Sequence, residues 1–367
     1  MYSNVIIWDL ELIFSKLYGL ISIIFLCLFS IYVMNIQYVD VCCGLSWGDE
    51  GKGKIVSQLS KSGEYDFVCR WSGGSNAGHT VYVNDQKYAT HIIPSGIFYG
   101  VKSIIGPGCV IHYDSFMKEI NYLRENGFDT RLVKVSPRTH VVTEQHIEED
   151  KQKYSKTLGT TGNGIGPCYR DKYLRVGKRV MDDVDLFKDY LWDEKLYGNI
   201  LCEGAQGFWL DIEYGNYPYV TSSSTLPYGA CSLGFSPKQI RHIYGAVKIY
   251  DTRVGYDPDF SEELLDNEEL RLLGEVGCEF GTTTGRQRSV NYLQVDKLIT
   301  AINCSGTTHL IISKVDIAEK VGVFKYYFEE NLHECENMDI LKEALIKVLK
   351  THTNIVEIIF SSNPTKI

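Results

Sequence analysis

The stretch Val39-Asp40-Val41-Cys42-Cys43-Gly44-Leu45-Ser46-Trp47-Gly48-Asp49-Glu50-Gly51-Lys52-Gly53-Lys54 decides the fold of this chain. Its apolar first half, Val39 to Leu45, is typical of a buried strand, and the apolar residues after the loop have helical spacing. Glycines let backbone N–H groups close around anionic oxygens, lysines add positive charge, and a helix N-terminus adds the positive end of its dipole. The stretch therefore predicts a phosphate-binding loop between a strand and a helix.

This loop differs from a Walker A loop at two positions. Ile55 stands where that motif has the Ser or Thr that holds magnesium. Asp49 lies inside the loop, although a carboxylate repels the phosphate that such a loop binds. An acid at this position needs a metal ion or a proton to bind. We therefore predict that the loop is catalytic as well as nucleotide-binding.

Downstream of Ile36, apolar strand patterns alternate with helical patterns. The expected strands are Asp66 to Trp71, Ser103 to His112, Arg131 to Val142, Asn199 to Cys202, His309 to Ser313 and Ile355 to Phe360. The expected helices are Asp114 to Asn126 (capped by Asp114 and ended by Gly127), Val295 to Asn303 and Asp339 to Lys350, and Asn84-Asp85 marks a hairpin turn. This alternation predicts an α/β fold with a large, mainly parallel β-sheet flanked by helices, and ligand loops after the strand ends. We expect residues 36–367 to form a single catalytic domain.

Composition excludes some classes of function. The net charge is -9 and the isoelectric point about 5.5, which argues against a general nucleic-acid-binding surface. The eleven cysteines are scattered without zinc spacing, which favours free thiols in a reducing, cytoplasmic compartment.

Residues 1–35 form an apolar N-terminal extension that we expect to lie outside the folded enzyme. Leu17 to Met34 is long enough for a marginal membrane span. The segment before it is acidic, however, and no small-residue cleavage site follows, so the pattern does not match a targeting signal. We interpret Met34 as the true start, and a membrane anchor is the alternative.

Several further loops carry polar residues suited to ligand binding. Gly73-Gly74-Ser75-Asn76-Ala77-Gly78-His79-Thr80 follows the second strand, where a histidine in a glycine-rich loop favours a catalytic role. Gly159-Thr160-Thr161-Gly162-Asn163-Gly164-Ile165-Gly166-Pro167 is either a mobile surface loop or a second phosphate site. Glu203-Gly204-Ala205-Gln206-Gly207 and Tyr217-Pro218-Tyr219-Val220-Thr221 carry weak signals alone. In Gly281-Thr282-Thr283-Thr284-Gly285-Arg286-Gln287-Arg288, hydroxyls beside two arginines suit carboxylate or phosphate binding, and the alternative is a solvated charged loop.

Ser313-Lys314-Val315-Asp316 ends an apolar strand and is similar to the N/T-K-x-D element that binds guanine. A carboxylate at its last position can accept hydrogen bonds from both the ring N–H and the exocyclic amine of guanine. Four residues alone are a weak signal, but a phosphate loop on the same sheet points to GTP.

Taken together, these motifs resemble the adenylosuccinate synthetase family, GTP-dependent ligases that join IMP to L-aspartate. W-G-D-E-G-K-G-K, N-A-G-H-T, G-T-T-G-x-G-I-G-P, E-G-A-Q-G, Y-P-Y-V-T-S-S, T-T-G-R-x-R and K-x-D occur in family order between Trp47 and Asp316. The resemblance implies the family's parallel-sheet domain, a Mg2+ cofactor, and a homodimer in which Arg175 reaches the partner's site. A short segment between Asp182 and Asn199 indicates a short form of the family.

By position, the resemblance also implies catalytic roles. Asp49 would take the proton from N1 of IMP and bind magnesium, with the backbone of Gly78 as a second metal ligand. His79 would be the acid that stabilises charge between the β- and γ-phosphates of GTP. Gln206 would polarise O6 of IMP, and Lys52 would neutralise the transferred phosphoryl group.

The implied binding residues form three sets. GTP would contact Gly48, Asp49, Glu50, Gly51, Lys52, Gly53, Lys54, Gly78, His79, Thr80, Arg288, Lys314, Val315, Asp316, Ser361, Ser362 and Asn363. IMP would contact Asp49, Glu50, Gly51, Lys52, Asn76, Ala77, Gly78, His79, Thr161, Arg175, Gln206, Thr221 and Arg286. Aspartate would contact Thr282, Thr283, Thr284, Gly285, Arg286, Gln287 and Arg288.

The chain departs from the family pattern at two places. Asn163 replaces the usual arginine, and Ser361-Ser362-Asn363-Pro364-Thr365-Lys366 stands for S-T-G-P-x-R, which leaves nucleotide preference open. The nearest alternative is a phage-type synthetase acting on dGMP, but that branch replaces the loop aspartate, which is intact here. A non-catalytic GTP-binding protein would leave His79 and the arginine-rich loop unexplained, and a membrane-tethered scaffold would rest on residues 17–34 alone.

Overall fold

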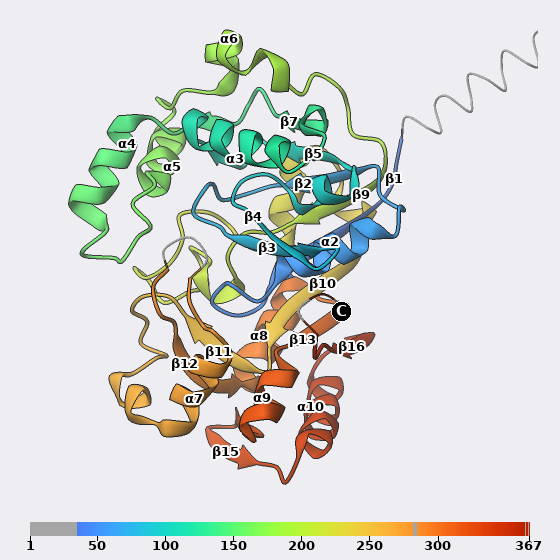
Figure 1. The fold of residues 1–367 in the computed structure, drawn as a ribbon, viewed down its shortest axis with the longest axis vertical. Coiled ribbons are helices and arrows are strands. Elements are labelled where there is room, and N and C mark those ends of the chain that lie inside the picture. Colours follow the sequence, from blue (N-terminus) through green and yellow to red (C-terminus); the bar gives the residue numbers. More distant parts are fainter. Residues whose placement is uncertain (1–34, 282–284, 364, 366) are drawn as a thin grey trace, which may run out of the picture.

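A computed structural model describes residues 35–281, 285–363, 365 and 367, and its centre is one eight-stranded sheet (Figure 1). The strand order is β16-β13-β10-β1-β9-β2-β5-β7, and every neighbouring pair is parallel. In that order the strands span Glu357–Phe360, His309–Ser313, Ile240–Lys248, Ile36–Gly44, Gly198–Glu203, Phe67–Arg70, Lys102–Ile105 and Val133–Val135. The α/β fold with a large parallel sheet flanked by helices is confirmed.

Helices cover both faces of this sheet, as residues on the central strand β1 show: they alternate between two cores, one on each face. Val39, Val41 and Cys43 belong to the core that includes α8 (Val295–Ser305) and α10 (Met338–His352). Cys42 points to the other face and packs in a core with Ile55 of α2 (Lys52–Lys61). Since both faces are buried, the strand has the mainly apolar run that made it recognisable in the sequence.

The helix α10 illustrates how local sequence sets an element. The side chain of Asn337 caps it by accepting from the backbone N–H groups of Asp339 and Ile340. Leu341, Leu345 and Leu349 follow at four-residue spacing and are all buried, so one stripe faces the sheet.

A second core lies beyond the β2 side of the sheet. The hairpin of β3 (His79–Val83) and β4 (Gln86–Thr90) contributes Val81 and Tyr88 to it, and α3 (Tyr113–Glu125) contributes Phe116, Ile120 and Leu123. The hairpin is the one expected around Asn84-Asp85, and both turn residues have positive φ. This core fixes the position of β3, and His79 is the first residue of that strand.

A smaller mixed sheet was not anticipated from the sequence. It has the order β11-β12-β14-β15, formed by Tyr250–Arg253, Ser289–Gln294, Lys325–Phe328 and Asn331–Glu334. It lies in the same half of the molecule as α7 (Glu268–Val276), α9 (Val315–Val321) and α10 (Figure 1). Its β12 follows directly after residues 281–288, so this sheet positions the arginine-rich loop.

Three local predictions were wrong. The expected strand Ser103 to His112 is broken, because Gly106-Pro107-Gly108 turns the chain between β5 and a short strand β6 (Val110–Ile111). The expected strand Arg131 to Val142 likewise contains a 3-10 turn (Thr130–Leu132), β7, and a separate β8 (His140–Val141) that pairs with β6. Asp114 is not the cap of α3: His112 occupies that position, and Asp114 lies in the first turn.

The expected apolar extension, residues 1–35, lies outside the described residues except for its last position. Among the residues that are described, no helix combines the length and the apolar character that a membrane span requires.

Candidate active site

A cleft of about 900 Å³ opens at the carboxyl ends of the parallel strands. The loops after β1, β2, β9 and β13 all contribute to its wall, which is where open α/β sheets bind ligands. The expected site residues that line it are Gly48, Asp49, Glu50, Gly51, Lys52, Gly53, Lys54, Asn76, Ala77, Gly78, His79, Thr80, Thr161, Gln206, Thr221, Arg286, Arg288, Lys314, Asp316 and Asn363. Motifs far apart in the chain thus converge in one cavity.

Other expected residues lie elsewhere. Val315 is fully buried in the core, and Ser361 is buried beside the cleft rather than in its wall. Gly285, Gln287 and Ser362 are exposed and do not line the cavity. Arg175 is exposed at the C-terminal end of α5 (Ile165–Leu174), outside the cleft of its own chain. Thr282, Thr283 and Thr284 fall outside the described residues.

The phosphate loop, residues 48–54, opens directly into α2. Gly51 precedes the helix with a φ of 94° and no side chain caps the helix start, which leaves backbone N–H groups directed at the loop. Glu50 turns back into the protein: its carboxylate accepts from the backbone N–H of Gly48 at 2.9 Å and from Lys52 Nζ at 2.7 Å. Both side chains of this ion pair are buried, so Glu50 fixes both the loop and Lys52.

Close packing brings His79 against this loop. A Cβ at Gly53 would lie 2.8 Å from Cβ of His79, so the first turn of α2 needs glycine there. Any larger residue at position 53 would displace the His79 side chain from the phosphate loop.

Three proposed catalytic or recognition residues adopt the left-handed backbone region, which non-glycine residues rarely enter. Their φ values are 59° for Asp49, 55° for Gln206 and 64° for Lys314. Each such residue costs on the order of 1–3 kcal/mol, and strained residues cluster at functional sites. The backbone thus marks the same three loops that the motifs indicated.

Asp49 is paired with the arginine-rich loop. Arg288 Nε donates to Asp49 Oδ2 at 2.9 Å, and Nη2 forms an ion pair with the same oxygen at 2.7 Å. The same guanidinium also contacts the buried Glu279 through Nη1. Burial lowers the pKa of Arg288, but Asp49 and Glu279 outweigh it and raise the pKa above its usual value. Two loops that are 239 residues apart in the chain meet at this pair.

His79 is held by a buried carboxylate. Its Nδ1 contacts Glu203 Oε1, and both side chains are buried. Glu203 also accepts from the backbone N–H of Ser95 at 2.6 Å and from its hydroxyl at 2.7 Å. Because the carboxylate only accepts, Nδ1 carries a proton and Nε2 is left for the cleft. Burial lowers the pKa of His79, while the charge of Glu203 opposes that change.

Gln206, in the loop after β9, lies beside the phosphate loop and the glycine-rich loop, and its amide oxygen is buried. Its Oε1 has no hydrogen-bond partner among the described residues, and the side chain lines the cavity. Asn76 accepts from the backbone N–H of Gly74, which shapes the glycine-rich loop around it. Asn163 donates to the carbonyl oxygen of Ser75 at 3.3 Å, so it supports that loop from behind instead of lining the cleft.

At the other end, Lys54 links the phosphate loop to the C-terminal segment. Its Nζ donates to Ser361 Oγ at 2.7 Å and to the carbonyl oxygen of Asn363 at 3.0 Å. Burial lowers the pKa of Lys54 to about 8. Lys314 donates to the carbonyl oxygen of Gly277 at 2.7 Å, close to the position of Asp316 in the cavity wall.

Three buried residues, Lys248, Glu203 and Glu279, had no role predicted from the sequence. Lys248 ends β10 and lines the cleft, and its Nζ donates to Glu279 at 2.8 Å. Glu203 lay within a quoted motif, but no role was expected for it. The available signal for Lys248 was a lysine at the end of an apolar run, the same arrangement as Ser313-Lys314. Glu279 had no comparable signal.

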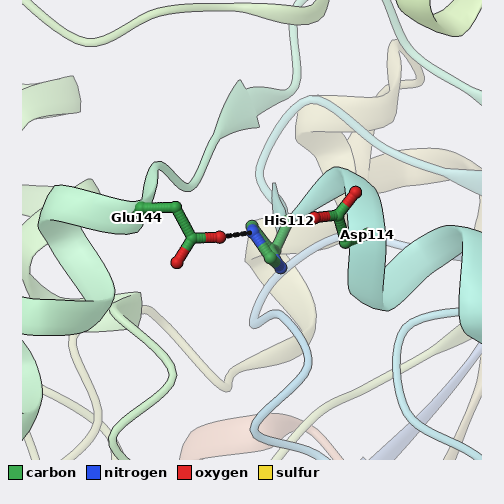
Figure 2. Close-up of side chains that lie close together, drawn as sticks. All are labelled: His112, Asp114 and Glu144. Atoms are coloured by element: carbon green, nitrogen blue, oxygen red, sulfur yellow. Dashed lines mark hydrogen bonds and ion pairs between the residues drawn. The ribbon is translucent and has the colours of Figure 1, made fainter.

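Outside the cleft, His112, Asp114 and Glu144 bring possible metal ligands within 4.8 Å of one another (Figure 2). Glu144 begins α4 (Glu144–Glu149) and its Oε1 lies 3.0 Å from His112 Nε2, while Ser115 Oγ contacts Nδ1. Both ring nitrogens are therefore engaged, and the group sits at two helix N-termini, whose dipoles disfavour a cation. We assign no metal to it.

Known proteins resemble this chain over most of its length. The family model described as adenylosuccinate synthetase matches residues 41–198 and 187–342. The adenylosuccinate synthetase of Lysinibacillus sphaericus is 35% identical over 83% of this chain and 86% of its own length. The fully ligated adenylosuccinate synthetase of Plasmodium falciparum superposes with a TM-score of 0.74 at 29% identity, covering 89% of this chain and 98% of that structure. The succinoaminodeoxyadenylate synthetase of cyanophage S-2L, bound to dGMP and dATP, shares the fold with a TM-score of 0.70 at 19% identity, over 90% of this chain and 94% of that structure.

Proposed function

Because this chain belongs to the adenylosuccinate synthetase family, we propose that its cleft joins IMP to L-aspartate with GTP as the phosphoryl donor. The observation that carries the assignment is Asp49: an intact carboxylate inside a phosphate loop, strained to φ 59° and facing the arginine-rich loop. A loop that only bound nucleotide would gain nothing from this charge.

The chemistry accounts for the residue types in the cleft. O6 of IMP is a poor leaving group, so it is first phosphorylated to 6-phosphoryl-IMP, and the aspartate amine then displaces phosphate, leaving GDP and phosphate as products. Asp49 takes the proton from N1 of IMP, which moves electron density to O6 and makes it the nucleophile toward the γ-phosphate. The amide of Gln206 hydrogen-bonds O6.

Phosphoryl transfer depends on charge neutralisation and positioning more than on covalent help. Lys52, held by Glu50, offsets charge on the transferred group. His79 acts from the β–γ side, and its contact with Glu203 directs Nε2 into the cleft and supports the protonated ring.

The donor atoms at Asp49 and Gly78 suit magnesium. Mg2+ binds through one or two carboxylates, backbone oxygen, water and substrate phosphates, and both residues line the same cavity as the phosphate loop. When bound, the ion would neutralise phosphate charge and draw the leaving group toward departure.

Recognition is divided between the two sides of β1. Asn76, Thr161 and Thr221 would hold IMP beside Gln206. Lys314 and Asp316 would bind guanine, with Asn363 closing that end. Arg286 and Arg288 would bind the aspartate carboxylates, because guanidinium groups form bidentate pairs with carboxylates.

A homodimer would complete the IMP site. Arg175 is exposed with a φ of 67°, and its neighbours Tyr173, Leu174 and Val176 are 71%, 62% and 72% exposed. Exposed apolar side chains in a run are typical of a contact surface, so we propose that Arg175 reaches the partner's cleft from this surface. The ten described cysteines are free, which supports a cytoplasmic location.

The test is a reconstitution assay that follows adenylosuccinate formation from IMP, aspartate, GTP and magnesium. We expect product only when all four are present, and not when dGMP replaces IMP. Product from dGMP at an equal rate would favour the phage-type activity. GTP hydrolysis without a product linked to aspartate would instead favour a GTP-binding switch.

A further inference from the structure

Glu279 is a buried carboxylate that contacts three cations at once. Its side chain is 1% exposed. Oε2 accepts from Lys248 Nζ at 2.8 Å and contacts Arg288 Nη1. Oε1 accepts from the hydroxyl of Tyr250 at 2.8 Å and lies 3.5 Å from Lys314 Nζ.

The charge of Glu279 is maintained by these partners. Burial alone would raise the pKa of its carboxyl, but Lys248, Lys314 and Arg288 lower it to about 2. These cations therefore favour the ionised form of the carboxyl. An ionised carboxylate is needed here, because a neutral side chain would leave buried cations without a counter-charge.

We infer that Glu279 is a positioning residue that couples aspartate binding to guanine recognition. This inference rests on the proposed function, in which Arg288 binds aspartate and Lys314 belongs to the guanine element. One carboxylate therefore holds both cations, which lie on different loops. No motif identified this residue.

The shared carboxylate gives the coupling a direction. When aspartate draws Arg288 toward its own carboxylates, Glu279 has one cation fewer to satisfy and attracts Lys314 more strongly. Lys314 is then better fixed where guanine binds. Linkage is reciprocal, so GTP should tighten aspartate binding by the same factor. Occupancy by IMP should be affected less, because its proposed contacts Asn76 and Gln206 lie on the loops after β2 and β9, on the other side of β1.

The experiment measures initial rates of adenylosuccinate formation over a grid of GTP and aspartate concentrations, with IMP saturating. In the wild-type protein, we expect the KM for GTP to fall as aspartate rises. Glu279→Gln should raise both KM values about tenfold or more and abolish their interdependence, because an amide cannot accept from all four donors. The KM for IMP should change less than the other two, since its proposed contacts Asn76 and Gln206 lie on loops that, among the described residues, form no hydrogen bond or ion pair with Glu279 or its cations.

Two further variants separate positioning from folding. Tyr250→Phe removes one hydrogen bond to Oε1 but keeps the ring, and Tyr250 is buried and does not line the cleft. It should raise the same two KM values about two- to fivefold and weaken their coupling. Glu275→Gln is the matched control, since Glu275 lies on the same segment but is exposed and pairs only with Arg271.

The outcomes are distinct. If the wild type makes no adenylosuccinate, the proposed function fails. If the wild type is active but the folded Glu279→Gln and Tyr250→Phe variants keep both KM values and their coupling, the inference alone fails. A lower melting temperature with unchanged kinetics in Tyr250→Phe would likewise reduce Glu279 to a structural role, even if Glu279→Gln does not fold.

Discussion

Replacing Glu203 with glutamine tests the role of His79 without touching the histidine. The amide keeps the shape of the side chain but loses the negative charge beside Nδ1. A buried hydrogen bond to a charged group contributes about 1.5–3 kcal/mol. If that stabilisation acts on the protonated ring in the transition state, kcat should fall about 10- to 150-fold. Binding of IMP should change little, because the side-chain hydrogen bonds of Glu203 to described residues go to His79 and Ser95.

The pH dependence gives a second, independent measure. Burial already lowers the pKa of His79, and Glu203 is the group that opposes it. Removing that charge lowers the pKa further, so the protonated ring is lost at a lower pH. In a plot of log kcat against pH, the limb that falls toward alkaline pH should therefore move to lower pH in Glu203→Gln.

Glu119→Gln is the matched control. Glu119 is equally a buried carboxylate, but it accepts from the backbone N–H groups of His91, Ile92 and Ile93 and does not line the cleft. This variant should lose stability and keep its pH profile. If Glu203→Gln kept kcat within about twofold and left the profile unmoved, Glu203 would not orient a catalytic acid.

Four other changes have defined outcomes. Asp49→Asn should lower kcat about 10³-fold or more while IMP still binds, as measured by rates and calorimetry; retention of most of the rate would exclude Asp49 as the base. Since the pKa of Lys54 is about 8, its positive charge is lost as pH rises through that value, so kcat/KM for GTP should decline there, and Lys54→Arg should remove the decline. Burial raises the pKa of Asp251 to about 7, so the folded state holds a proton that the unfolded state releases between about pH 4 and 7. Denaturant unfolding should show stability falling with rising pH in that window, and Asp251→Asn should flatten the slope. Asp316→Asn should shift preference from GTP toward xanthosine triphosphate, because the amide N–H can donate to the exocyclic 2-oxo group of xanthine; an unchanged ratio of kcat/KM values would move guanine recognition elsewhere.

The sequence predicted the parts of the fold that have strong local signals. The strand β1 carries a mainly apolar run from Val39 to Gly44, broken only at Asp40, and the hairpin carries an Asn-Asp turn, so both were recognised. The strand β10 was missed, although it pairs with β1, because Arg241 and His242 interrupt its apolar pattern at the strand start. Those polar residues are explained only by the tertiary structure: Arg241 pairs with the buried Asp40.

The same distinction applies to the site. The site residues in glycine-rich loops were predicted, because a glycine-rich loop after a parallel strand usually binds a ligand. Glu279 could not be predicted, since a buried ion network has no characteristic spacing and depends on which strands become neighbours, and the only signal for Lys248 was its place at the end of an apolar run. The break after β5 at Gly106-Pro107-Gly108 lies between two apolar segments, which together resemble one longer strand in the sequence.

The strand order has a consequence for how enzymes of this architecture diverge. The guanine element follows β13 and the proposed IMP contacts follow β9 and β2, and β10 and β1 separate the two groups. Three interstrand steps amount to about 14 Å, a distance beyond which mutational effects usually add independently. A descendant could therefore exchange its acceptor nucleotide by drift on one side of β1 while inheriting its donor preference unchanged. Aspartate and GTP share Arg288, Glu279 and Lys314, so selection would have to alter those two specificities together.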